Sequence, residues 1–408
     1  MFRSHIAGAA VALALSVFAL PASGGAQGLQ GWVGAWEAAP QAQTGPLKPI
    51  GNQTVRQRLR SSLAGRRLRV VLSNAYGTKP LVIGAASIAR SKDGVVEGAP
   101  VALRFGGRSS IVVPPGAPAY SDPVDLPVDS MAELSVSLFL PQSTLPETYH
   151  RALPAQDAAG PAVAAEALIS AEGDFTDKAA LAGSSPGARL FVARLDVLPA
   201  RPAKLVAVLG TTRTEGDGRW PEHLARRLQA ARHNVGVVNA SLVANPLTRP
   251  YPGGGEAALA RFDRDVLMVP GLTHVVLADA INDIGQPGGP VVPAAEAPSL
   301  QLLTDAYLQL AARARARGVK VIAATVPPFE GVPFQGFYSA EKEALRMALN
   351  QWIRASVAFD GVIDLDAILR DPARPSRITA SLATANSFGP NDAGEHRIAE
   401  SLDLRLFR

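Results

Sequence analysis

The sequence predicts an α/β domain with a five-stranded parallel sheet and helices on both faces, preceded by an all-β sandwich or jelly-roll domain. From residue 203 onward, short apolar runs alternate with amphipathic segments, a pattern typical of parallel strands joined by helices. Between residues 30 and 200, β-branched runs are separated by turn signals roughly every ten residues. The 408 residues, 47% hydrophobic and 18% charged, suffice for two globular domains.

The first residues have the features of a secretory signal. Arg3 provides a positive charge, residues 6–20 are apolar, and small residues follow with a cleavage position after Ala26. We therefore expect residues 1–26 to be a signal peptide and the mature protein to be exported, either periplasmic or secreted. The apolar run is short for a stable membrane span.

The chain contains no cysteine, which excludes disulfides, a thiol nucleophile and a cysteine metal site. An exported protein of this kind must be held together by its hydrophobic cores.

The region 30–200 is expected to form the β-sandwich domain. Apolar residues alternate with serines and a phenylalanine over 134–140, as in a strand with one buried face. Trp32 and Trp36 come early in this region, and two roles remain open for them. Core packing is favoured over a sugar-stacking platform, because aromatic side chains dominate hydrophobic cores.

The stretch VAVLGTTRTEGDG, residues 206–218, is the point around which the expected 203–408 domain is organised. A buried strand ends at Gly210 and is followed by two threonines, a glycine-rich turn and a helix. The expected strands of this domain cover 204–210, 235–241, 273–280, 320–327 and 361–366, and the expected helices cover 220–232, 256–269, 298–317, 339–357 and 391–404.

Polar residues follow the expected strands. Thr211 and Thr212 follow the first strand, Ser241 ends the second, and Asn282 follows the third. The loop 380–396 precedes the last helix. Because functional residues of open α/β sheets lie outside the carboxyl ends of the strands, we expect these residues to form one site.

This layout resembles the SGNH, or GDSL-like, hydrolases, and secreted esterases in particular. The similarity lies in VLGTTRTEGDG, VGVVNASLVANPL, ADAINDIG and PNDAGEHRIAESL, while WVGAWEAAPQ and VVLSNAYGTKPLVIGAA resemble the β-domain that precedes some of these enzymes. The resemblance implies a flavodoxin-like fold and an acyl-enzyme mechanism. In that mechanism a serine attacks an ester, a histidine acts as the base, and an aspartate orients the histidine.

Carried over by position, the resemblance places Thr212 at the nucleophile, Asn386 at the aspartate and Gly389 at the histidine. It assigns the oxyanion hole to the backbone N–H groups of Thr212 and Ser241 and to the side chain of Asn282. Thr212 keeps a hydroxyl but adds a methyl group. Asn386 cannot hold an imidazolium by charge, and Gly389 offers no base.

Four histidines lie in the C-terminal half. His233 and His274 are expected at the opposite edge of the sheet, whereas His223 and His396 are nearer the site. His396 lies roughly 10 Å beyond Gly389 along the last helix, so helix packing is the favoured role.

We expect no metal and no cofactor. Asp279, Asp283 and Glu330 lack a histidine at ligand spacing, so hydrogen bonding within loops is the favoured role for them. The glycine-rich turn has neither the Lys-Ser/Thr of a phosphate-binding loop nor the three-glycine dinucleotide spacing. The net charge of +5 comes with scattered arginines, which argues against nucleic acid as a partner.

Three hypotheses follow, and the first is favoured. In the first, the protein is a pseudoenzyme that binds a small-molecule or glycan ester without cleaving it. In the second, it is an active or weakly active esterase with a rewired base. In the third, it is a carbohydrate-binding envelope protein in which the β-domain does the binding. The first rests on the joint substitution at Thr212, Asn386 and Gly389, since members of a triad act as a unit. The sequence carries no signal for an oligomeric state.

Overall fold

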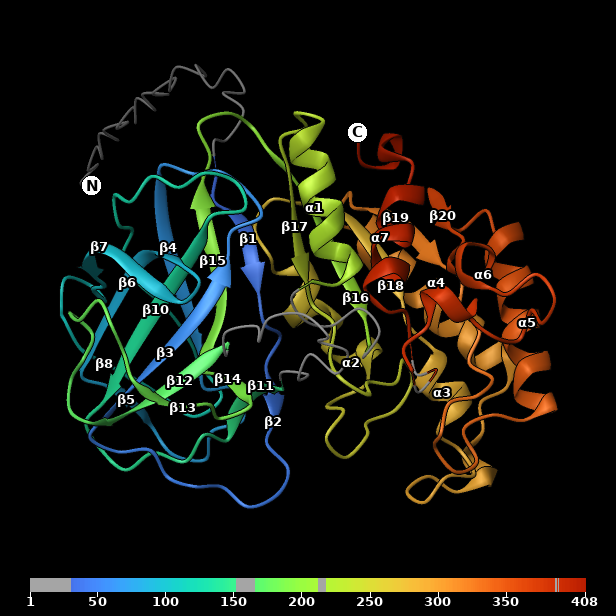
Figure 1. Ribbon diagram of the computed structural model, residues 1–408, viewed down its shortest axis with the longest axis horizontal. Coiled ribbons are helices and arrows are strands. Elements are labelled where there is room, and N and C mark those ends of the chain that lie inside the picture. The colour runs from blue at the N-terminus through green and yellow to red at the C-terminus, as the bar shows by residue number, and fades with distance from the viewer. Residues whose placement is uncertain (1–30, 152–165, 212–217, 386, 388) are drawn as a thin grey trace, which may run out of the picture.

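The computed structural model describes residues 31–151, 166–211, 218–385, 387 and 389–408. A β-rich N-terminal part and an α/β C-terminal part lie side by side (Figure 1). The expected signal peptide, residues 1–26, lies outside the described residues. None of the helices in the described ranges has the length and apolar character needed to cross a membrane.

The C-terminal part contains the predicted five-stranded parallel sheet. Its strand order is β17 (Val235–Asn239), β16 (Lys204–Gly210), β18 (Leu272–Ala278), β19 (Lys320–Ala324) and β20 (Gly361–Ile363). Successive residues of β16 point to opposite faces, and both faces are buried: Val206 and Val208 join one apolar core, and Leu205 and Leu209 join another. This double burial explains why the strand sequences read as continuous apolar runs.

Helices cover both faces of the sheet. One core contains α1 (Trp220–Ala230), α6 (Leu365–Leu369) and α7 (Asp392–Ser401), and the other contains α2 (Ala258–Phe262), α3 (Ile281–Gly285), α4 (Leu300–Arg315) and α5 (Ala340–Ala355).

The predicted helix 256–269 is in fact the short α2 continued by a π-helical turn, Asp263–Leu267. The wider turn accompanies the burial of Asp265, which pairs with Arg261 at 3.2 Å and Arg264 at 2.6 Å.

The N-terminal part is mainly antiparallel. A four-stranded sheet has the order β1 (Val33–Glu37), β15 (Val192–Leu198), β4 (Arg67–Ser73) and β9 (Pro118–Tyr120), and a six-stranded sheet has the order β13 (Gly183–Ser184), β12 (Ala167–Glu172), β3 (Gln53–Arg60), β10 (Glu133–Leu140), β6 (Ala85–Lys92) and β7 (Val95–Ala102). The smaller sheets join β14 (Ala188–Leu190), β11 (Thr148–Arg151) and β2 (Gln41–Ala42), and β5 (Leu81–Ile83) with β8 (Ile111–Val113). Side chains of the two large sheets share one apolar core, as in a β-sandwich.

The alternation expected along 134–140 holds for the apolar positions, but the serines between them are buried as well. The burial of Ser137 is explained by Arg56, whose Nε donates to Ser137 Oγ at 2.8 Å. The terminal nitrogens of Arg56 donate to the carbonyl groups of Phe175, Lys178 and Ala179. The segment around 175–179 therefore covers the outer face of β10.

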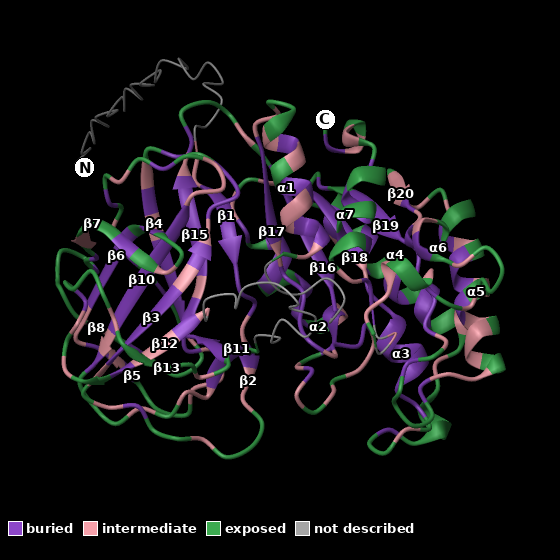
Figure 2. Cartoon of the chain, viewed as in Figure 1, coloured by how far each residue is buried: buried purple, intermediate pink, exposed green. Residues whose placement is uncertain are grey.

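The two parts join through the edge strands β1 and β17, which carry buried residues along their length (Figure 2). Gly34 N donates to Pro270 O at 2.9 Å. The buried Ser62 Oγ donates to Ala35 O at 2.8 Å and accepts from Val237 N at 3.0 Å. One continuous apolar core spans the β-sandwich and one face of the parallel sheet, so the junction is rigidly packed.

We predict that Ser62→Ala lowers the free energy of unfolding by about 1–3 kcal/mol, because it leaves the buried Val237 N–H without its acceptor. The matched control is Ser135→Ala, since Ser135 Oγ is buried and has no hydrogen-bond partner among the described residues. That change should leave stability unchanged or raise it slightly. Denaturant titration of both variants tests this, and equal effects would contradict the role assigned to Ser62.

Candidate functional site

The residues that the sequence predicts as a site follow strands of the parallel sheet. Thr211 follows β16, Ser241 follows β17, Asn282 lies in α3 after β18, and Gly389 precedes α7. The nucleophile position Thr212 and the aspartate position Asn386 lie outside the described residues. The assignment of those two positions stays a prediction.

Asn282 is positioned by a sharp change of direction after β18. Ala280 adopts a left-handed conformation with φ of 86°, and α3 begins at the next residue. The buried Asn282 Nδ2 then donates to Thr211 Oγ1 at 2.5 Å and to Asn245 O at 3.0 Å. The amide group has two N–H hydrogens, and both are engaged within the protein.

The second expected oxyanion donor is also engaged. Ser241 is fully buried, and its backbone N–H donates to Asn239 Oδ1 at 3.2 Å. Both predicted donors that the structure describes therefore hold strand ends together. An incoming oxyanion would have to break these bonds before it could be stabilised.

Gly389 lies in a closed turn at the entrance to α7. Thr384 N donates to Gly389 O at 2.9 Å, and Gly389 N donates to Thr384 Oγ1 at 3.3 Å. Asn391 then caps α7 by accepting from Gly394 N at 3.0 Å. Glycine provides no side chain at this position.

The two nearer histidines contact each other. The ring centroids of His223 and His396 are 3.9 Å apart, and His223 Nε2 lies 3.0 Å from Gly218 O. Burial, with the neighbouring His396, lowers the pKa of His223. His274 lies at the start of β18 and His233 just beyond the end of α1, at the opposite edge of the sheet.

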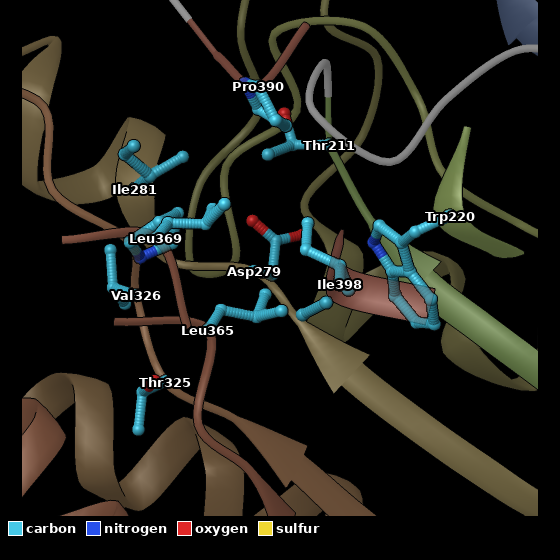
Figure 3. Close-up of a pocket in the computed structure, with 12 residues that line it drawn as sticks. Thr211, Trp220, Asp279, Ile281, Thr325, Val326, Leu365, Leu369, Pro390 and Ile398 are labelled. Carbon is cyan, nitrogen blue, oxygen red and sulfur yellow. The ribbon is translucent and has the colours of Figure 1, made fainter. Parts of the chain in front are cut away.

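A small cavity lies behind Thr211 (Figure 3). It has room for about one water molecule, roughly 20 Å³, and its lining is mostly apolar. Its lining includes Thr211, Trp220, Asp279, Ile281, Val326, Leu365, Leu369, Pro390 and Ile398. In the sequence, Thr211 and Pro390 are the neighbours of the predicted nucleophile and histidine positions.

Asp279 is the buried acid of this cavity. Its Oδ1 accepts from Ala280 N at 2.7 Å, whereas Oδ2 has no hydrogen-bond partner among the described residues. Burial, reinforced by the nearby Asp283, raises the pKa of Asp279 to about 7.

The expectation of loop hydrogen bonding therefore fits Asp279 only in part. It fits Asp283, which accepts from the backbone N–H groups of Leu247 at 2.6 Å and Thr248 at 2.9 Å. It also fits Glu330, which bonds Ser376 and pairs with Arg374 and Arg377.

Sequence reasoning missed Glu395, which connects the first and last helices of the α/β domain. Its carboxylate is buried in α7 and accepts from Trp220 N at 2.8 Å and Arg219 Nη1 at 3.2 Å. Burial raises its pKa to about 7. A glutamate in an amphipathic helix ordinarily faces solvent, so nothing in the sequence distinguished it.

Within the described ranges, no three His, Asp or Glu side chains gather as metal ligands would.

Residues 205–397 match the GDSL-like Lipase/Acylhydrolase family. Similar solved structures include an acetyl xylan esterase (17% identity, TM-score 0.37, covering 48% of this chain and 96% of that chain). An aryl esterase from M. smegmatis is also similar (14% identity, TM-score 0.38, covering 50% of this chain and 100% of that chain). So is a GDSL-like lipase from Bacteroides thetaiotaomicron (16% identity, TM-score 0.36, covering 50% of this chain and 87% of that chain). A comparison with curated proteins finds no match.

We predict that Asp279→Asn flattens the dependence of stability on pH. The folded protein keeps the Asp279 proton up to pH about 7, while the unfolded chain releases it near pH 3.8, the ordinary pKa of an aspartate, so wild-type stability falls as pH rises between these values. The substitution should reduce the decrease of the unfolding free energy with pH by about 1.4 kcal/mol per pH unit. Urea titrations from roughly pH 4.5 to 6.5, inside this window, measure it.

The control is Asp403→Asn, because a hydrogen bond from Arg405 lowers the pKa of the exposed Asp403 to about 2, below this range. Identical slopes for wild type and Asp279→Asn would show that Asp279 is ionised in the folded protein.

Proposed function

We propose that this chain, whose C-terminal domain belongs to the GDSL-like lipase/acylhydrolase family, is an exported protein that binds an ester ligand without cleaving it efficiently. Its ligand would occupy the carboxyl edge of the parallel sheet, where this family carries out ester hydrolysis. Export is proposed from the signal-like residues 1–26.

The observation that carries this proposal is Gly389. The turn before α7 is formed and hydrogen-bonded, yet the position aligned with the general base has no side chain. A threonine hydroxyl at position 212 would then lack a group to take its proton, and without that transfer it is a weak nucleophile at neutral pH. Asn386, at the orienting position, adds no negative charge.

The predicted oxyanion donors, which already make hydrogen bonds within the protein, also support binding without efficient cleavage. Ser241 N–H and both N–H groups of the Asn282 side chain donate to protein oxygens. Oxyanion donors contribute most when they are preorganised and available to the charge that develops in the transition state. Donors that already hold strand ends together contribute less.

The alternative of an active esterase draws on the retained hydroxyl of Thr212 and on Asn282, and in the described part of the chain its candidate base is the His223–His396 pair. These imidazoles contact each other and a backbone carbonyl, and the lowered pKa of His223 makes it a poorer proton acceptor.

The alternative of a carbohydrate platform on the β-domain is weakened by two arginines. Arg189 Cζ lies 5.0 Å from the ring centre of the buried Trp36, and Arg69 Cζ lies 4.7 Å from that of Trp32, so one face of each indole is covered by a guanidinium group.

We predict that the protein hydrolyses short-chain aryl esters at a rate close to that of buffer, and that Thr212→Ala leaves this rate unchanged. Removing the orienting and base residues of a serine hydrolase costs roughly 10⁴ or more in rate. Spectrophotometric release of the aryl alcohol measures it. Turnover well above buffer that disappears in Thr212→Ala would overturn the proposal.

A gain-of-function test uses the triple variant Thr212→Ser, Asn386→Asp and Gly389→His. If the scaffold keeps the family's geometry, esterase activity should rise at least about tenfold above wild type, because nucleophile, base and orienting group act as a unit. The matched control carries Thr212→Ser alone and should remain inactive. A folded but inactive triple variant would show that the site itself has been remodelled.

A further inference from the structure

The cavity behind Thr211 contains two buried polar atoms that the rest of the protein does not satisfy. Trp220 is fully buried and Asp279 is 4% exposed. Trp220 Nε1 and Asp279 Oδ2 both lack a hydrogen-bond partner in the described part of the chain. Both residues line the same cavity, and in Figure 3 the nitrogen edge of the Trp220 indole is on the side of Asp279, with Ile398 drawn between them. Leaving such groups unpaired is costly, so a complementary occupant would be strongly favoured.

The two atoms define what that occupant must offer. The indole N–H can only donate a hydrogen bond, and an ionised carboxylate oxygen can only accept one. The occupant must therefore present one acceptor and one donor within the space of a single water molecule. A hydroxyl group meets this requirement, whereas a ketone lacks the donor and an ammonium group lacks the acceptor.

The surrounding walls limit the group that can enter the cavity to a small one. Ile281, Val326, Leu365, Leu369 and Ile398 make the lining apolar. Thr211 and Pro390 border the cavity where it meets the carboxyl edge of the sheet. The hydroxyl would fill this space, so the aliphatic carbon attached to it would lie outside the cavity, toward the carboxyl edge that Thr211 and Pro390 border.

We infer that this cavity recognises the hydroxyl group of an alcohol, presented by Trp220 and Asp279 with a donor and an acceptor. The alcohol is a small aliphatic one or the alcohol portion of a larger ligand. The inference rests on the proposed function in placing the ligand at the carboxyl edge. It adds a recognition point that the aligned catalytic positions do not provide.

The charge on Asp279 sets the strength of this selectivity. Asp283 and burial favour its neutral form, and Arg261 favours its carboxylate. Above about pH 8 the carboxylate accepts only, so the site should discriminate against ketones. Below about pH 6 the protonated carboxyl can also donate, and a ketone should then be accepted nearly as well.

The test compares 2-propanol with acetone, which have the same heavy-atom skeleton and differ in the hydroxyl. The chain has four tryptophans, so the indole N–H resonance of Trp220 can be followed by NMR in the full protein and assigned with Trp220→Phe. At about pH 8 we expect a saturable shift of that resonance, with about fivefold tighter binding of 2-propanol than of acetone.

Asp279→Asn should abolish or reverse this preference, because Oδ1 still accepts from Ala280 N while an N–H₂ group replaces the free acceptor. Ile398→Val, which changes only an apolar wall, should leave the preference intact. If Asp279→Asn does not fold, the loss of preference in wild type at about pH 5.5 provides the same test.

Equal binding of both compounds at about pH 8 would overturn the inference. So would an indole resonance that neither compound moves but that shows contact with a bound water, since the cavity would then hold structural water. These outcomes are independent of ester turnover, so failure of this inference is distinguishable from failure of the proposed function.

Discussion

The side-chain amide of Asn282 is the interaction on which the candidate site depends. It comes from α3, after β18, and donates to Thr211 after β16 and to the backbone of Asn245 in the loop after β17. One buried group thus connects the loops that follow three neighbouring strands. The left-handed Ala280 makes this possible, because it turns the chain back over the end of β18 immediately.

The same interaction is consistent with the proposal that this framework binds an ester without cleaving it efficiently. In a catalytic site the asparagine amide would be available to the oxyanion, and a histidine would stand ready to accept a proton. Here the amide holds loops together, Ser241 N–H is engaged by Asn239, and Gly389 closes a turn. These hydrogen bonds hold the carboxyl edge of the sheet together, as the proposed binding role requires.

The parallel sheet could be predicted because its strands are buried on both faces, which leaves an unmistakable run of apolar residues. The five-residue helices α3 and α6 could not, because they are too short to show a 3.6-residue period. The proximity of Thr211 and Asn282 followed from the topology of strand ends. The placement of Asp279 and Trp220 around one cavity could not be predicted, since it depends on how α1 packs over the sheet. The boundary near residue 202, export and the roles of Thr212 and Asn386 stay predictions.

The central claim is that this site contains no activated nucleophile, and covalent labelling tests it most directly. The native protein is incubated with an alkyl fluorophosphonate, which phosphonylates activated serine or threonine hydroxyls, and its intact mass is measured. The absence of a nearby base predicts an unchanged mass under conditions that fully label the triple revertant at residues 212, 386 and 389. A stoichiometric adduct that maps to Thr212 in the native protein would contradict the account.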